Sequence, residues 1–251
     1  MRECMFCQEQ ASSREDIWPQ WLTKRFPLTD ASYMEAERGG QKIGTWKNKT
    51  PKLLPARCVC GNCNSGWMSN LEVEMKPIVE SIMDKQLRVL DVSSIAVIAV
   101  WASKTAMALE ALYPEREFFY SKNERQNMRA ISAIPARTSI WIASCVNQPN
   151  IYSAGKDLRT APGDNEAKAY VTTMAFGSLA IQVASIRALA NIPNEVQITY
   201  DSREGPWDKT LLQVWPIIQH SQQWPPSYGL DGEYGLEALT ERLSPVINGQ
   251  S

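Results

Sequence analysis

Residues 60–75 read CGNCNSGWMSNLEVEM, and this stretch determines how the first part of the chain can fold. Two residues separate Cys60 from Cys63, a spacing that lets both thiolates bind one metal ion at about 2.3 Å. Gly61 permits the tight turn between them, and the residues that follow have helical character. The stretch therefore predicts half of a metal site at the start of a helix.

A second pair with the same spacing, Cys4 and Cys7, stands near the N-terminus. Two close pairs in a segment with few apolar residues favour a structural Zn²⁺ ion held by Cys4, Cys7, Cys60 and Cys63, with no open coordination position. A set of free buried thiols is the alternative. Cys58 is an alternative ligand, although Cys60 and Cys63 have the better spacing.

Composition and charge exclude some classes of protein. A formal net charge of -1 and a pI near 6.0 give the molecule no overall field that attracts nucleic acid or anionic membrane, so any such contact must come from a local patch. No basic segment followed by an apolar run opens the chain, which predicts a cytoplasmic protein. The most apolar stretch, residues 95–102, is far shorter than the roughly 20 residues that span a bilayer, and it predicts a buried helix instead of a membrane contact.

The composition changes near residue 76, and this change predicts two domains. Residues 1–76 would form a metal-binding module, because their apolar content is too small for a core without a staple. Residues 77–251 would form a larger α+β domain, in which a central helix packs on an antiparallel sheet.

The elements of the larger domain are predicted from periodicity and residue type. Residues 93–112 are apolar nearly all round and predict the central helix, with serines able to cap its start, and a shorter helix is predicted within residues 117–131. Cys145, in an apolar strand pattern, is predicted to be a buried core thiol. Runs of β-branched and aromatic residues predict strands at residues 138–146, 169–183 (with a bend at Gly177), 196–200 and 211–214, and a last short helix is predicted at residues 236–243.

Two segments resemble a branch of the HNH endonuclease superfamily found in phages and bacteria. Residues 13–22 read SREDIWPQWL and residues 60–72 read CGNCNSGWMSNLE. In that branch a Cys-x-x-Cys pair precedes Glu-His-Ile-x-Pro-x-Trp-Leu, and a second pair runs into Cys-Asn-x-Gly-Trp-Met. The resemblance implies a zinc-stapled treble-clef module of the ββα-metal type. Residues 98–107 and 124–129 more loosely resemble the helical region that follows in the same proteins.

The resemblance also implies a catalytic ion that is separate from the zinc. In HNH enzymes a carboxylate beside a histidine, and an Asn or His at the later helix start, hold one divalent ion against the scissile phosphate. By position, Glu15 and Asn64 are expected to bind Mg²⁺ or Mn²⁺, hard cations that prefer oxygen ligands. The implied function is metal-dependent hydrolysis of phosphodiester bonds in DNA.

Asp16 occupies the position where the general-base histidine is expected. An aspartate with a pKa near 3.9 accepts protons less readily at neutral pH than a histidine near 6.5, so the replacement costs about 10²- to 10⁴-fold in rate. A carboxylate remains compatible with hydrolysis as ligand or base, because a bound metal lowers the pKa of its water. The alternative function is a non-catalytic, zinc-stabilised factor that binds nucleic acid or protein. A purely structural interpretation places Glu15 and Asp16 in the first turn of a helix.

Residues 38–57, RGGQKIGTWKNKTPKLLPAR, lie between the two cysteine pairs and contain six basic residues without an acid. An aromatic side chain among cations suits a phosphate backbone with a base stacked beside it, so this basic stretch predicts DNA contact. A solvated hairpin is the alternative interpretation. The residues expected to contact DNA are Arg38, Lys42, Trp46, Lys47, Lys49, Lys52 and Arg57.

Packing accounts for other prominent residues. Trp18, Trp21, Trp67 and Met68 are predicted to fill the module and its junction with the larger domain. Lys104 lies inside the apolar helix, where a buried ammonium requires a partner. The candidates are Glu110, another acid, or a phosphate at the junction.

Overall fold

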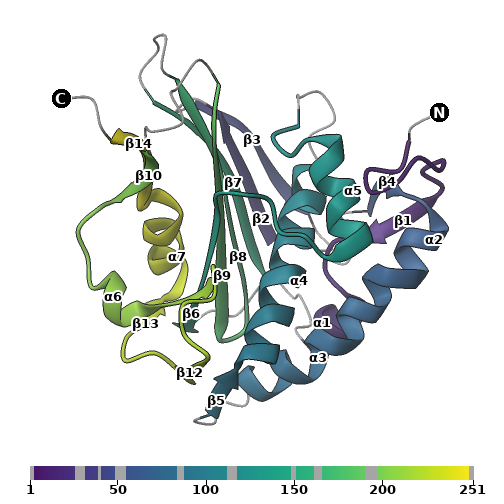
Figure 1. Cartoon of the computed structure of the whole chain (residues 1–251). Helices are drawn as coiled ribbons and strands as arrows, with labels where there is room; N and C mark the ends of the chain where they lie inside the picture. The colour runs from purple at the N-terminus through teal and green to yellow at the C-terminus, as the bar shows by residue number, and fades with distance from the viewer. Residues whose placement is uncertain are drawn as a thin grey trace.

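The computed structural model describes residues 3–25, 32–38, 41–48, 55–83, 88–111, 118–147, 151–160, 166–189 and 197–248. For residues 14–16, 32–38, 41–48 and 55–57 the backbone alone is described. Within these ranges the protein is a mixed α+β structure in three layers, with one large sheet between two groups of smaller elements (Figure 1).

The large sheet contains eight strands. Seven of them follow one another in the order β11 (Leu211–Trp215), β6 (Thr138–Val146), β9 (Leu179–Ala188), β8 (Ala167–Phe176), β7 (Tyr152–Arg159), β2 (Ser32–Arg38) and β3 (Gln41–Asn48). The eighth, β13 (Gly229–Asp231), pairs with β6. The predicted antiparallel arrangement holds for most pairs, but β2 runs parallel to β7 and β13 parallel to β6.

The centre of the sheet is the hairpin β8–β9, whose pairing runs from Ala167 opposite Ala188 to Phe176 opposite Leu179. The prediction of one strand over residues 169–183 is therefore wrong, although the bend predicted at Gly177 coincides with the turn between the two strands. Gly177 has a φ of 55°, a left-handed conformation that suits the tight turn between two strands. Nearly every residue of β8 and β9 is buried, so no alternation of apolar and polar residues marks where the first strand ends.

Three helices cover one face of the sheet: α3 (Ser69–Met83), α4 (Val92–Glu110) and α5 (Lys122–Ile131) (Figure 1). Both α4 and α5 match predicted helices. Asp91, and not a serine, caps α4, because its carboxylate accepts the N–H of Ser94 at 2.8 Å. Among the described helices α4 has the length and hydropathy of a membrane span, yet 67% of its apolar window is buried inside the structure. It forms the core between α3 and the sheet.

The opposite face is covered by α7 (Gly232–Glu241) and by the antiparallel pair β10 (Gln197–Ser202) and β14 (Leu243–Asn248). α7 contacts β6, β8 and β9, while β14 contacts β7 and β8. These contacts explain why β8 and β9 are buried on both faces. Two smaller elements complete this part of the chain: α6 (Trp207–Thr210), and the pairing of β5 (Arg88–Asp91) with β12 (Ser221–Trp224).

The segment before residue 77 is connected to the sheet in two ways. The predicted domain boundary at residues 76–77 falls inside α3, which is one continuous helix. In addition, β2 and β3 extend the large sheet through the pairing of β2 with β7. The first segment therefore contributes strands to the same sheet as the remainder of the chain.

Candidate metal centre

Two short strands and a helix start bring the cysteine pairs together. β1 (Ser13–Asp16) and β4 (Pro55–Val59) pair antiparallel, with Glu15 opposite Ala56. After β4 the chain forms a short turn of helix, α2 (Gly61–Cys63), and a π-helical turn, η1 (Asn64–Met68), that leads into α3. The N–H of Met5 donates to the carbonyl of Cys58 at 2.8 Å, which fastens the first cysteine pair to β4.

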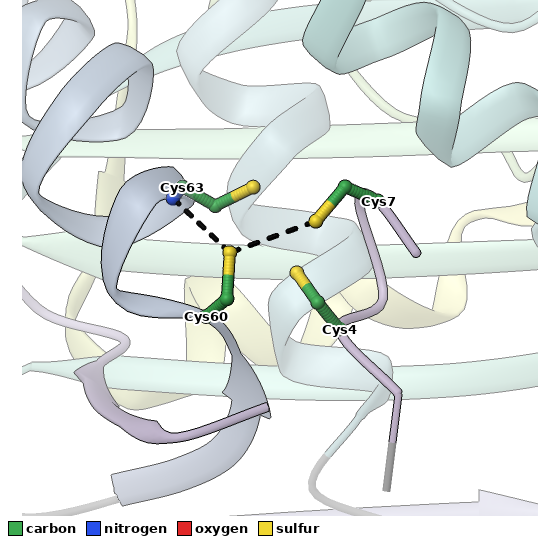
Figure 2. Close-up of side chains that lie close together, drawn as sticks. All are labelled: Cys4, Cys7, Cys60 and Cys63. Atoms are coloured by element: carbon green, nitrogen blue, oxygen red, sulfur yellow. Dashed lines mark hydrogen bonds between the residues drawn. The ribbon is translucent and has the colours of Figure 1, made fainter. Parts of the chain in front are cut away.

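The sulfur atoms of Cys4, Cys7, Cys60 and Cys63 all lie within 4.8 Å of one another. Figure 2 shows the four side chains converging, with Cys7 Sγ 3.6 Å from Cys60 Sγ. Cys60 caps the helix start, because its Sγ accepts the N–H of Cys63 at 3.4 Å. The prediction that these four cysteines are placed to bind a metal ion is confirmed; we call the group the metal centre.

Burial is the main influence on the protonation of three cysteines in the metal centre. Burial raises the pKa of Cys60 to about 11. Burial and the charge of Cys4 raise the pKa of Cys63 as well. Burial also opposes ionisation of Cys4, but N–H groups such as that of Phe6 hold its pKa below the ordinary value. A divalent cation would stabilise all four thiolates together, and the donor set therefore fits a metal.

Two contacts surround the four cysteines: one brings a cation beside them, and the other joins the loops that carry them. Arg129, in the last turn of α5, lies beside Cys63, whose charge raises the pKa of the guanidinium. Asn62 donates through Nδ2 to the Glu9 carboxylate at 3.1 and 3.2 Å, which joins the loops that carry the two cysteine pairs. The sequence analysis missed Arg129, because only tertiary packing brings α5 to this site.

The two other cysteines are not part of the metal centre. Cys58 lies in β4 and is buried, and the group of four that could hold a metal does not include it. Cys145 is buried in β6, and burial raises its pKa to about 11, in agreement with its predicted role as a core thiol.

The expected catalytic residues lie on β1 and at the start of η1. Asn64 donates through Nδ2 to Ser13 Oγ at 2.6 Å, so the beginning of η1 lies against the beginning of β1. Glu15 and Asp16 are strand residues, which contradicts the interpretation that they open a helix; pairing with β4 holds residues 13–16 extended. Their side chains lie outside the described residues. His220 is exposed between β11 and β12.

The basic stretch contributes backbone to three strands. Arg38 ends β2, while Lys42, Trp46 and Lys47 belong to β3, and Arg57 lies in β4. None of these side chains is described, and Lys49 and Lys52 lie outside the described residues. Their predicted contact with DNA stays a prediction. The hairpin β2–β3 extends the large sheet beyond β7.

Lys104 is fully buried, and its Nζ lies 3.7 Å from Glu72 Oε1 on α3. Its Nζ also lies 5.7 Å from the ring centroid of Trp101. The expected candidate Glu110 instead accepts the backbone N–H groups of Phe119 and Tyr120. The partner is thus the other acid that the sequence left unidentified, and the pair joins α3 to α4.

The tryptophan predictions agree with the packing. Trp18 and Met68 are buried in the main core, and Trp21 and Trp67 are partly buried against it. The rings of Phe6 and Trp67 meet edge to face at 5.1 Å, and Trp18 contacts Phe176 of β8 in the same way at 5.9 Å. The first segment is thereby packed directly on the large sheet.

Comparison with known proteins adds no identity, since no family model, curated protein or solved structure matches the chain.

Proposed function

We propose that the metal centre holds a structural Zn²⁺ ion in a treble-clef module of the HNH type, and that this module hydrolyses phosphodiester bonds in DNA with Mg²⁺ or Mn²⁺. The observation that carries the proposal is the 2.6 Å hydrogen bond between Asn64 and Ser13. It joins the helix start that bears one expected ligand to the strand that bears Glu15.

The chain order supports the treble-clef assignment. A cysteine pair is followed by β1, then by β4 antiparallel to it, and then by a second cysteine pair at a helix start. Four sulfur ligands suit Zn²⁺, and a regular tetrahedron with bonds of about 2.3 Å separates the sulfurs by about 3.8 Å. The spread of up to 4.8 Å among the four sulfurs accommodates this geometry with small movements.

The proposed reaction assigns distinct roles to three residues. A divalent ion, when bound, stabilises charge on the scissile phosphate and lowers the pKa of water. The Glu15 carboxylate and the Asn64 amide oxygen are the proposed ligands, and the hydrogen bond to Ser13 fixes the amide plane of Asn64. Asp16 is the proposed proton acceptor, and its low ordinary pKa makes it a weak one.

The second candidate is a non-catalytic, zinc-stabilised protein that binds nucleic acid or a protein partner. Asp16 favours it, because a carboxylate stands where the related enzymes carry histidine and the single histidine of this chain is exposed between β11 and β12. The zinc ion would then serve the fold alone.

Cleavage assays with three proteins separate these candidates. Plasmid DNA is incubated with Mg²⁺ or Mn²⁺ and the native chain, Glu15→Gln or Asp16→His. Cleavage by the native chain that Glu15→Gln abolishes supports the nuclease. Cleavage by Asp16→His alone supports a site that lost its base, and no cleavage by any of the three rules out hydrolysis at this site. Elemental analysis of the purified protein tests for one zinc per chain.

A further inference from the structure

One end of the large sheet carries a row of basic residues outside the segment that resembles a nuclease. Arg159 of β7 pairs opposite Lys168 of β8, and Lys168 pairs opposite Arg187 of β9. Residues directly opposite each other on neighbouring strands project from the same face. Arg137 stands just before β6, and its carbonyl accepts the N–H of Ile186 at 3.1 Å. Three adjacent strands thus contribute Arg159, Lys168 and Arg187, and Arg137 lies beside them in the turn before β6. We call these four residues the basic row.

Burial distinguishes this end from the rest of the strands. Lys168 is the one residue of β8 that is not buried, and β9 is buried up to Arg187. Arg137 is exposed and has a φ of 55°. An L-residue with a side chain is strained in this left-handed region, where glycine is relaxed.

A cavity of about 270 Å³ opens beside the basic row. Arg137 and Arg187 contribute to its wall, and Ser185 is fixed by hydrogen bonds to Thr138 at 2.7 Å and Tyr120 at 3.2 Å. These contacts give the cavity a fixed polar group beside two guanidinium groups. The complete lining is Phe119, Glu124, Ala136, Arg137, Ser185, Ile186, Arg187 and Ala188.

The charge around the cavity is positive. Arg187 pairs with Glu124 at 2.7 Å, and Arg159 pairs with Glu166 at 3.3 Å. Among the described residues Arg137 and Lys168 have no ion pair, so a partner carboxylate offsets only two of the four cations of the row. Lys168 and Arg187 both lie over the ring of Phe119, at 5.8 and 4.3 Å from its centroid. Such a group suits a ligand that carries several negative charges.

The helix α5 connects the row to the metal centre. Its Glu124 binds Arg187, and its Arg125 donates through Nε to the carbonyl of Met5 at 3.0 Å. From β7 to β6, four strands at about 4.8 Å spacing span about 14 Å, a length of about four nucleotides at about 3.4 Å each.

We propose that the basic row and its cavity bind the phosphate backbone of a nucleic acid, with one phosphate group at the cavity. The inference deepens the proposed nuclease function and rests on it for the identity of the polymer. The row holds the strand while α5 fixes its position relative to the metal centre.

The test compares two double variants of equal charge by measuring the affinity for a labelled DNA duplex at several salt concentrations. Ca²⁺ replaces Mg²⁺ in this assay to prevent turnover. Arg137→Gly with Lys168→Gln removes two cations of the row, while Arg203→Gln with Lys209→Gln removes two exposed cations outside it. The row variant is expected to bind roughly tenfold more weakly and to lower the salt slope by about 1.8, since each phosphate contact contributes about 0.9. Equal affinity and slope in the row variant and the native chain would overturn the proposal, as would an equal loss in the control variant.

Two further measurements, competition by inorganic phosphate and cleavage by the row variant, identify the ligand and separate this inference from the nuclease proposal. Inorganic phosphate that displaces the duplex at millimolar concentration would show a small-anion site and overturn the backbone assignment. Duplex binding that depends on the row, without any metal-dependent cleavage, would retain the row and reject the nuclease. Metal-dependent cleavage with an unchanged KM in the row variant would retain the nuclease and reject the row. Thermal unfolding provides the folding control, because Arg137→Gly is expected to unfold at the same temperature as the native chain or above it.

Discussion

The metal centre and the hairpin β8–β9 are both buried, but different forces hold them. Four thiols within 4.8 Å of one another would repel as thiolates, and a bound cation would offset that repulsion. In β8 and β9 nearly every residue is buried between α4 on one face and α7 with β14 on the other. Apolar burial alone can stabilise such a hairpin. The comparison shows two kinds of buried region in one chain: a group of four thiols placed to bind a cation, and a hairpin packed between other elements on both faces.

The largest effect should follow from loss of the metal ligands. Cys4→Ser with Cys63→Ser is expected to abolish metal binding and to unfold the region around β1, β4 and the start of α3, because structural zinc binding contributes about 10–16 kcal/mol. Metal content and thermal unfolding are the measurements. Cys58→Ala is the matched control, since it changes a buried cysteine outside the metal centre and should keep the metal. Loss of metal in the control would contradict the assigned ligand set.

The second prediction concerns a core substitution in the hairpin β8–β9. Ile181→Ala removes a fully buried side chain from β9 and should lower the free energy of unfolding by about 2–5 kcal/mol without altering metal content. Denaturant unfolding and elemental analysis of the same sample check both parts. A loss of metal in this variant would show that the two regions are coupled more closely than their different forces suggest.

The ion pair between Lys104 and Glu72 should respond unequally to removal of its two partners. Glu72→Gln leaves a buried ammonium without its carboxylate and should cost about 1–3 kcal/mol, because Glu72 is partly exposed and water offsets part of the loss. Lys104→Met removes the charge and should change stability by less than about 1 kcal/mol. Chemical denaturation measures both variants. Equal costs would indicate that the pair itself, and not the buried charge, governs stability at the contact between α3 and α4.

The smallest expected effect is a pH dependence at α5. Burial opposes ionisation of Glu124, but Arg187 and Ser121 hold its pKa below the ordinary 4.5. A depressed pKa stabilises the fold above pH 4.5, and this contribution is lost as the pH falls through the folded value. Stability measured between about pH 6 and pH 3 should therefore fall less steeply in Glu124→Gln than in the native chain. Parallel curves for the two proteins would count against the role of Glu124.

The sequence predicted local features better than pairings between distant segments. The spacing within each cysteine pair predicted metal ligands, and continuous apolar character predicted α4, because each of these signals lies within a few turns of chain. The sequence predicted a bend at Gly177 but not that it separates two strands, since burial on both faces removes the alternation that marks a hairpin.

The pairings that the sequence did not reveal join residues far apart in the chain. Arg129 lies beside Cys63 because α5 packs next to the metal centre. Glu72 meets Lys104 because α3 packs against α4. Residue type alone did not distinguish Glu72 from Glu110 as the partner of Lys104. The parallel pairing of β2 with β7 depends on a partner that appears more than a hundred residues later. Such contacts follow from topology, which residue patterns within one segment do not encode.

The parallel pairing of β2 with β7 also sets an order of events during synthesis. All four cysteines have emerged from the ribosome once residue 63 is exposed, whereas β7 begins at Tyr152. At about 5–20 residues per second, the intervening chain of about 90 residues takes roughly 5–20 seconds to synthesise. During that interval the hairpin β2–β3 has an unpaired edge, and metal captured by the nascent chain would anchor it close to the site where its partner strand later arrives.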